Sequence, residues 1–534
     1  MAYHYVGAGR DQLFLLPVSM RDWLDEGHLA WFVLDVVAAI DTSGFHVRHP
    51  NDGVGRPAYD PDMMLALLFY AYGMGVRSSR RIEALCRTDA AFRVIAAGVV
   101  PDHATVARFL VDHERAIEDA FVDVLRLCAS AGLVSVGLIA IDGTKVGADA
   151  ALDANRGRAA IGAELARLRA EVEAIVVEAK AADAAEDAQQ GLFGLDRLPV
   201  GLTTRTGRLA RLEAALVTIE AEDDADRAAA AERAAKAAEA AGEGRRLRGR
   251  KPKDPQAALA QAEAEVHAAA ARMAAMVAER AATRAAIEAR AAVEGRKLRG
   301  PAPGGPRRRE RRELEQAQRR LDQARVRAAD AVGDRRRVNL TDPDSRIMKT
   351  PGGWVQGYNA QAAVNENQIV VATAVTQDAN DVHQYQPMVA ATQAALTAAG
   401  VDEPIGLIVA DAGYWSEDNA TAPGPDRLIA TLKDWKQRRA ARQLGTTSGP
   451  PPPDAAPLEA MEHRLRTPQG AQAYAHRSHT VEPVFADSKQ NRGWRRFRRR
   501  GLTAARSEWA LMNLSHNIAK LFDHQNIHPA QLLA

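Results

Sequence analysis

The chain has 534 residues and a formal net charge of +2, from 70 lysines and arginines against 68 aspartates and glutamates. Such a length has room for about three domains and a large core, and a nearly neutral total does not by itself predict a nucleic-acid partner. No apolar run is long enough to span a membrane, and no basic-then-apolar leader opens the sequence, so we expect neither insertion nor secretion. The two cysteines, Cys86 and Cys128, exclude a disulfide framework and favour a reducing cytoplasm.

Residues 1–132 have the pattern of an all-helical domain. Asp60 and Pro61 supply an N-cap and a first-turn proline before the apolar stretch MMLALLFYAYGM. The arginines on the polar faces of two short helices that follow are Arg80, Arg81 and Arg108. These helices would form a DNA-binding helix-turn-helix, or else part of an ordinary bundle with surface arginines.

A buried strand is predicted next, at Val134–Val146, within residues 133–155 that begin a second domain. Residues 156–337 are then dominated by Ala, Arg, Glu and Gln, a composition typical of long helices in closely packed hairpins. Within them GRRLRGRKPKDP recurs as GRKLRGPAPGGP, each copy indicating a turn between helices. The RGRKPK segment is either an exposed basic turn or a hook for the DNA minor groove.

Residues 338–534 return to a β pattern. WVQGYNAQAAV and QIVVATAVTQ are joined by NEN, a natural hairpin connection, and a helix at about His383–Ala399 precedes the strand in IGLIVADAGYW. A further strand, DRLIATL, is followed by a proline-rich linker at Gln437–Pro457 and by basic C-terminal helices. The order of strands and helices predicts an α/β fold with a mixed sheet, whose first three strands form a meander. The helical segment 156–337 is an insertion between the first and second of these strands.

Three acids are candidates for the chemistry. Asp142 and Asp411 each end a predicted strand, and because the first and fourth strands should be neighbours, we expect the two carboxylates to meet in the crevice there. Glu482 is predicted in the first turn of a helix with Thr480 as its N-cap. Taken singly, each acid has an ordinary role as a turn former or helix cap. Together, carboxylates without His or Cys suit Mg²⁺ or Mn²⁺, and two such ions about 4 Å apart catalyse displacement at phosphorus.

A basic stretch lies beside Glu482 in the sequence. NRGWRRFRRRGLTAAR holds seven arginines between Arg492 and Arg506, no acid, and two aromatic residues, Trp494 and Phe497. Arginines neutralise phosphates and aromatic rings stack on bases, so this stretch predicts salt-sensitive DNA binding, with a solvated basic turn as the alternative. Lys489, seven residues after Glu482, would reach a phosphate from the same helix face.

The segments IAIDGTK and VADAGY, with the spacing Y-x2-R…E-x6-K, resemble the DDE transposases of bacterial insertion sequences. More narrowly, GRPAYDPDMMLALLFYAY, PDHATVARF, DPDSR and GYNAQAAV resemble the group called insertion sequence eleven-eighty-two, within the insertion-sequence-four-like assemblage. The resemblance covers most of the chain outside the Ala-rich insertion. It implies an RNase H-like core, a Mg²⁺-dependent Asp-Asp-Glu triad and the ends of a mobile element as substrate.

Matched position by position, the resemblance makes Asp142, Asp411 and Glu482 the catalytic and metal-binding triad. Between Arg477 and Glu482 the chain has one residue more than the family's signature. The residues expected to contact DNA are Tyr474, Arg477, Lys489, Arg492, Trp494, Arg495, Arg496, Arg498 and Lys145.

The resemblance implies a transposase that binds terminal inverted repeats, cleaves them by hydrolysis with two Mg²⁺ ions, for which Mn²⁺ can substitute, and joins the 3′-hydroxyl ends to target DNA. Its partners would be double-stranded DNA and a second copy of the chain, because two ends must be brought together. We expect it at the nucleoid in the bacterial cytoplasm. The alternatives are a metal-dependent DNA endonuclease without strand transfer and a non-catalytic architectural DNA-binding protein.

Overall fold

The fold is described from a computed structural model of the chain. The residues that it describes are 19–47, 58–187, 200–242, 255–295, 308–330, 337–432 and 446–524. The chain divides into two compact units, one of residues Met1–Ala154 with Thr341–Ala534 and one of residues Asn155–Leu340. Among the described helices, none combines the length and the apolar character that a membrane span requires.

The first unit begins with helices. Their bounds are η1 Met20–Trp23, α1 Leu29–Ala39, α2 Ser43–His46, α3 Pro61–Gly73, α4 Ser79–Thr88, α5 Ala90–Ile95, α6 His103–Asp112 and α7 Glu114–Ser130. The expected start of α3 is confirmed, because the Asp60 side chain accepts a hydrogen bond from the Asp62 N–H and Pro61 occupies the first turn. α3 is apolar almost all round and packs against α1 and the C-terminal helix, so it is an interior helix.

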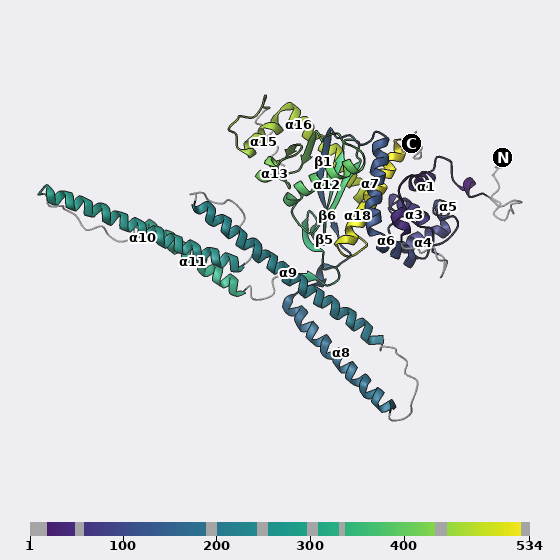
Figure 1. The fold of residues 1–534 in the computed structure, drawn as a ribbon, viewed down its shortest axis with the longest axis horizontal. Coiled ribbons are helices and arrows are strands. Elements are labelled where there is room, and N and C mark those ends of the chain that lie inside the picture. The colour runs from purple at the N-terminus through teal and green to yellow at the C-terminus, as the bar shows by residue number, and fades with distance from the viewer. Residues whose placement is uncertain are drawn as a thin grey trace, which may run out of the picture. The chain divides into compact units, whose positions relative to one another are not determined.

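A six-stranded mixed sheet forms the centre of the same unit (Figure 1). Its strands are β1 Leu138–Gly147, β4 Arg346–Thr350, β5 Gly353–Asn365, β6 Val370–Thr376, β7 Leu407–Ala410 and β8 Asp426–Ile429. They run in the order β4-β5-β1-β7-β8, with β6 also paired to β5. β1 is antiparallel to β5 and parallel to β7, and β5 is antiparallel to β6. The expected meander and mixed sheet are therefore confirmed, while β4 is a strand that the sequence pattern did not indicate.

The remaining helices of this unit cover the sheet. Their bounds are η3 Val382–Gln384, α12 Tyr385–Ala398, α13 Glu417–Thr421, α15 Pro457–Arg466, α16 Pro468–Ala475, α17 Arg477–Ala486, η4 Asp487–Asn491 and α18 Leu502–Asp523. α18 packs against β6, α7 and α3. Its Asn517 side chain accepts from the Val370 N–H and donates to the Val370 carbonyl, so a buried amide satisfies the start of β6.

The basic stretch after η4 differs from the expectation. Residues 492–501 are irregular rather than helical, and Gly493 and Gly501 have positive φ angles of 68° and 90°. The Gly147 N–H donates to the Arg495 carbonyl and the Phe497 N–H donates to the Gly147 carbonyl, so this segment adds to the end of β1. The backbone therefore satisfies its hydrogen bonds on the sheet, and a helix is not needed here.

The second unit contains long helices arranged in pairs (Figure 1). Its elements are β2 Asn155–Gly157, α8 Arg158–Asp187, α9 Val200–Gly242, α10 Pro255–Val293, α11 Arg308–Asp330 and β3 Arg337–Asn339. β2 and β3 pair antiparallel, so the chain enters and leaves the unit side by side. α8 and α9 pack through Ile161, Leu165 and Leu212, whereas α10 and α11 bury mainly alanine. The two repeated basic segments, including RGRKPK, lie mostly at 243–254 and 296–307, outside the described residues, so the choice between a basic turn and a minor-groove hook stays a prediction.

Candidate active site

Asp142 and Asp411 lie side by side in the sheet. β1 and β7 are parallel and pair up to Ile141 and Ala410, so each acid directly follows the last residue of this ladder. That the first and fourth strands are neighbours is therefore confirmed. That Asp142 ends its strand is wrong, because β1 continues to Gly147 on its other edge, where the long strand β5 keeps pairing with it.

Backbone N–H groups orient both carboxylates. Asp142 Oδ1 accepts from the Gly143 N–H at 2.8 Å, and Asp411 Oδ1 accepts from the Gly413 N–H at 2.7 Å. The pKa of Asp142 is raised to about 6, mainly by burial and also by the neighbouring Asp411 carboxylate, while the Arg477 guanidinium acts to lower it. The site therefore holds more negative charge than its surroundings favour.

Arg477 joins the first and third predicted acids. Its Nη2 lies 2.6 Å from Asp142 Oδ2, and its Nη1 lies 3.1 Å from Glu482 Oε1. The Arg477 side chain is largely buried, whereas the Glu482 side chain is 54% exposed. One guanidinium thus bridges a buried acid of the sheet and an exposed acid of α17.

The local structure around Glu482 departs from the expectation in one respect. α17 begins at Arg477, so Thr480 is not an N-cap; its hydroxyl instead donates to the carbonyls of His476 and Arg477. Pro483 lies inside the helix, where its missing N–H leaves the carbonyl four residues earlier without its helical donor. That carbonyl, of His479, accepts from Gln368 Nε2 at 2.9 Å, which accounts for a proline within α17.

A fourth acid, Asp381, lies at the same site and was not among the sequence candidates. Its Oδ1 accepts from Asn359 Nδ2 at 2.7 Å and from Gln361 Nε2 at 2.9 Å, and lies 3.2 Å from Lys145 Nζ. The Asp381 carboxylate also raises the pKa of Asp142. In the sequence it sits in DANDVHQ, where it resembles an ordinary acid before a helix.

Two glycines allow these acids to approach one another. A Cβ on Gly143 would lie 2.3 Å from Gln361 Nε2 and 2.6 Å from Asp381 Oδ1. A Cβ on Gly413 would lie 2.8 Å from Asp411 Oδ1. Side chains at these two positions would push the carboxylates and their donors apart, so the glycine one residue after Asp142 and the glycine two residues after Asp411 have a steric reason here.

The three acids of the predicted triad do not form a tight ligand cluster. In the part of the chain that the structure describes, they are not a group of three whose ligand atoms all lie within 4.8 Å of one another. His46, Asp60 and Asp62 do form such a group. In it, His46 Nε2 lies 2.9 Å from Asp62 Oδ1 and Asp60 caps α3, so both contacts have a structural role.

Two lysines predicted to contact DNA lie at the acidic site. Lys489 is in the π-helical turn η4, and its Nζ contacts the hydroxyl of Thr144 on β1. Burial lowers the pKa of Lys489. Lys145, also on β1, is paired with Asp381. The structure therefore brings Arg477, Lys489 and Lys145 to the edge of the same group of carboxylates.

The basic stretch is divided between buried and exposed residues. Trp494 is fully buried and Arg492 lies over its ring while pairing with Asp487 at 2.7 Å, so neither ring face is open to a base. Arg496 donates to the carbonyls of Ala148 and Ala150. The remaining predicted DNA contacts lie in different settings: Tyr474 is partly buried on α16, and Arg495 and Arg498 are exposed.

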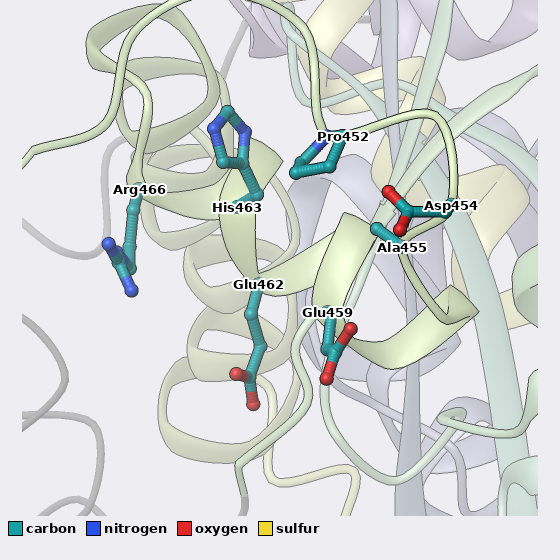
Figure 2. Close-up of a pocket in the computed structure, with 7 residues that line it drawn as sticks. All are labelled: Pro452, Asp454, Ala455, Glu459, Glu462, His463 and Arg466. Atoms are coloured by element: carbon teal, nitrogen blue, oxygen red, sulfur yellow. The ribbon is translucent and has the colours of Figure 1, made fainter.

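A cavity of about 450 Å³ lies elsewhere in this unit (Figure 2). Its lining residues are Pro452, Asp454, Ala455, Glu459, Glu462, His463 and Arg466. None of the predicted site residues is among them. Glu459, Glu462 and His463 come from the single helix α15, so the cavity is a hollow beside that helix rather than part of the acidic site (Figure 2).

Two family models match the chain. A model described as "Transposase DDE domain" matches residues 452–522, and a model described as "Transposase domain (DUF772)" matches residues 18–112. No curated protein and no solved structure matches. The two matches support a DDE transposase of insertion sequences, and a DDE domain implies an RNase H-like fold, in keeping with the mixed sheet.

Proposed function

We propose that this protein is the transposase of a bacterial insertion sequence, of the group called insertion sequence eleven-eighty-two, and that it cleaves the element's ends and joins them to target DNA. The observation that carries the proposal is the pairing of β1 with β7, which sets Asp142 beside Asp411, together with the Arg477 bridge from Asp142 to Glu482. Both matched family models describe transposase domains, and they include α17 and the N-terminal helices.

The proposed metal ligands are Asp142, Asp411 and Glu482. DDE transposases normally use divalent metal ions, and carboxylate oxygens are the donors that Mg²⁺ and Mn²⁺ prefer. The proposal that these carboxylates bind cations is supported by the raised pKa of Asp142, which reflects a buried carboxylate beside the acids Asp411 and Asp381. When bound, two such ions would activate a nucleophilic oxygen and neutralise charge on the phosphodiester.

The residues of the chain have separate tasks in this proposal. Arg477 supplies one positive charge between Asp142 and Glu482 and so keeps the two acids in one place. Asn359 and Gln361 hold Asp381 by hydrogen bonds, which fixes the acid that borders the site. Lys489 projects to Thr144, two residues from Asp142, from where its ammonium group can contact a phosphate of the bound strand.

The proposed partners are the double-stranded DNA of the element's ends and of the target. Transposition joins two ends in one event, so we propose that a dimer of this chain holds them. We also propose that the protein acts at the nucleoid of the bacterial cytoplasm, where this DNA is found.

The test measures cleavage on intact DNA from the borders of the element and joining with precleaved ends and a plasmid target, both with Mg²⁺. Asp142→Asn, Asp411→Asn and Glu482→Gln should each reduce cleavage and joining at least about a hundred-fold, while DNA binding in EDTA stays intact. The matched control is Asp418→Asn, which changes an exposed acid in the first turn of α13. If one of the three variants cleaves normally, that residue is not a ligand.

The same assay separates the alternatives. Cleaved ends without joined products would indicate a metal-dependent endonuclease. DNA binding that is equal in EDTA and Mg²⁺, with no cleavage at all, would indicate an architectural protein whose acids are structural.

A further inference from the structure

We propose that a basic pocket between α4 and α6 binds one backbone phosphate of duplex DNA, held by Arg80 and Arg498. The inference rests on the proposed function and deepens it, because it assigns the DNA a contact outside the acidic site. The pocket has a volume of about 300 Å³. Its polar lining residues are Arg77, Ser78, Ser79, Arg80, His103 and Arg498.

The pocket carries two positive charges that no acid balances. Arg80 and Arg498 are both exposed, and neither guanidinium makes a hydrogen bond or ion pair with any residue in the described ranges. The nearby acid Glu83 is already occupied, since it accepts from Arg87 at 2.7 Å and from the His103 ring at 2.8 Å. An anion entering the pocket would therefore meet two free guanidinium groups.

A buried ion pair fixes the position of Arg498 relative to α4. The Arg77 side chain is 6% exposed and lies 3.3 Å from Glu508, which is itself fully buried. Arg77 also donates to the carbonyls of Gly493 and Arg496, while Glu508 accepts from the backbone N–H groups of Arg498 and Arg499. This network ties the loop that carries Arg498 to the chain just before α4, so the two free arginines are held at one pocket.

The start of α4 adds hydrogen-bond donors to the same pocket. Ser78 is the N-cap residue, and its side chain makes no capping hydrogen bond. The first N–H groups of a ten-residue helix have no partner within the helix, and they carry partial positive charge. With the hydroxyls of Ser78 and Ser79, they complete a site in which guanidinium and N–H donors surround a single anionic group.

A phosphodiester suits this site better than a carboxylate of a protein partner. The group is tetrahedral, so its two free oxygens can meet two guanidinium groups while the donors of a helix start approach from another side, whereas the two oxygens of a carboxylate lie in one plane. Half or more of the contacts in protein–DNA complexes are of this kind, and they set the register of the duplex without reading its sequence. The pocket would thus position DNA rather than select it.

The experiment measures the affinity of the full chain for a short duplex, in EDTA, over a range of salt concentrations. One lost phosphate contact lowers the slope of log K against log salt by about 1. Arg80→Gln and Arg498→Gln should each lower it, and the double variant should lose about 1 in total rather than about 2, because both side chains hold one phosphate. Arg115→Gln, which removes an exposed arginine of α7 outside the pocket, is the matched control and should leave the slope unchanged.

Each outcome decides one proposal. An unchanged slope in the double variant, or an equal loss in Arg115→Gln, would overturn the pocket. If inorganic phosphate raises the melting temperature of the wild type but not of the double variant, while the DNA slopes are equal, the pocket binds free phosphate and the DNA contact is wrong. A wild type that never cleaves DNA, with the expected change of slope, would overturn the proposed function and leave the pocket standing.

Discussion

Helices α18 and α10 are both indicated by their composition, yet they are stabilised in different ways. Of the 22 residues of α18, 15 are buried, including the polar Glu508, Asn513 and Asn517. α10 has 39 residues, and in the part whose side chains are described it buries Ala262, Ala269 and Ala291. The comparison shows that helical propensity predicts only that a helix forms. The number of side chains that the helix buries decides how much the stability of the fold depends on that helix.

The largest effect is expected in α18, from Trp509→Ala. The Trp509 side chain is fully buried against Phe485, and its indole N–H donates to the Gln361 carbonyl. Removing it should lower the free energy of unfolding by about 3–5 kcal/mol, measured by urea denaturation. Trp354→Ala is the control, because that side chain is 63% exposed, and it should cost less than about 1 kcal/mol. Similar losses for both variants would contradict the buried role of α18.

Burial acts against stability at Asp142, and pH measures this effect. Because the folded pKa of about 6 is above the ordinary value of 3.8, the folded state holds this proton more tightly than the unfolded state. This proton therefore stabilises the folded state below about pH 4. As the pH rises through about 6 the stabilisation is lost, and the free energy of unfolding falls by up to roughly 3 kcal/mol. Urea denaturation in EDTA at both ends of this range should show the loss in the wild type and a smaller one in Asp142→Asn. If the free energy of unfolding depends on pH equally in the wild type and in Asp142→Asn, the pKa of Asp142 is not raised by burial.

A smaller effect is expected from the buried amide of α18. Asn517→Ala removes the partner of both the Val370 N–H and the Val370 carbonyl, which then lie buried without hydrogen bonds. We expect a loss of about 2 kcal/mol in the free energy of unfolding. Asn491→Ala, at an exposed amide that bonds to Asp487, is the control and should change it by no more than about 0.5 kcal/mol. A loss no larger than the control's would mean that water replaces the amide.

The smallest effect is expected between the helices of the second unit. Arg320 of α11 lies 3.2 Å from Glu265 of α10, and both side chains are more than a third exposed. Solvent screens such a pair, so Arg320→Gln should change the free energy of unfolding by less than about 1 kcal/mol, and high salt should erase the difference. A loss comparable to that of Trp509→Ala would show that the two helices depend on charge rather than on packing.

The acidic site was partly predictable. Asp142 and Asp411 could be found because each follows apolar β residues and precedes a small residue, a pattern set by the backbone of a buried strand. Asp381 could not, because its place depends on hydrogen bonds from Asn359 and Gln361 of β5, which only the folded sheet brings near. In the same way, Trp494 has the sequence context of a DNA-stacking residue, but it is buried beneath Arg492.

The amino-acid sequence by itself determined most of the periodic features, though not β4 or the irregular segment 492–501: the main helices and strands, their order, the meander, and the neighbouring strands that bear two aspartates. These follow from local spacing and from short connections, which act along the chain. Only the tertiary structure decided which charged groups meet, namely Arg477 with Asp142 and Glu482, and Arg77 with Glu508. Arg477 and Asp142, like Arg77 and Glu508, are hundreds of positions apart in the chain, and burial selects these partners because an unpaired buried charge costs too much to remain.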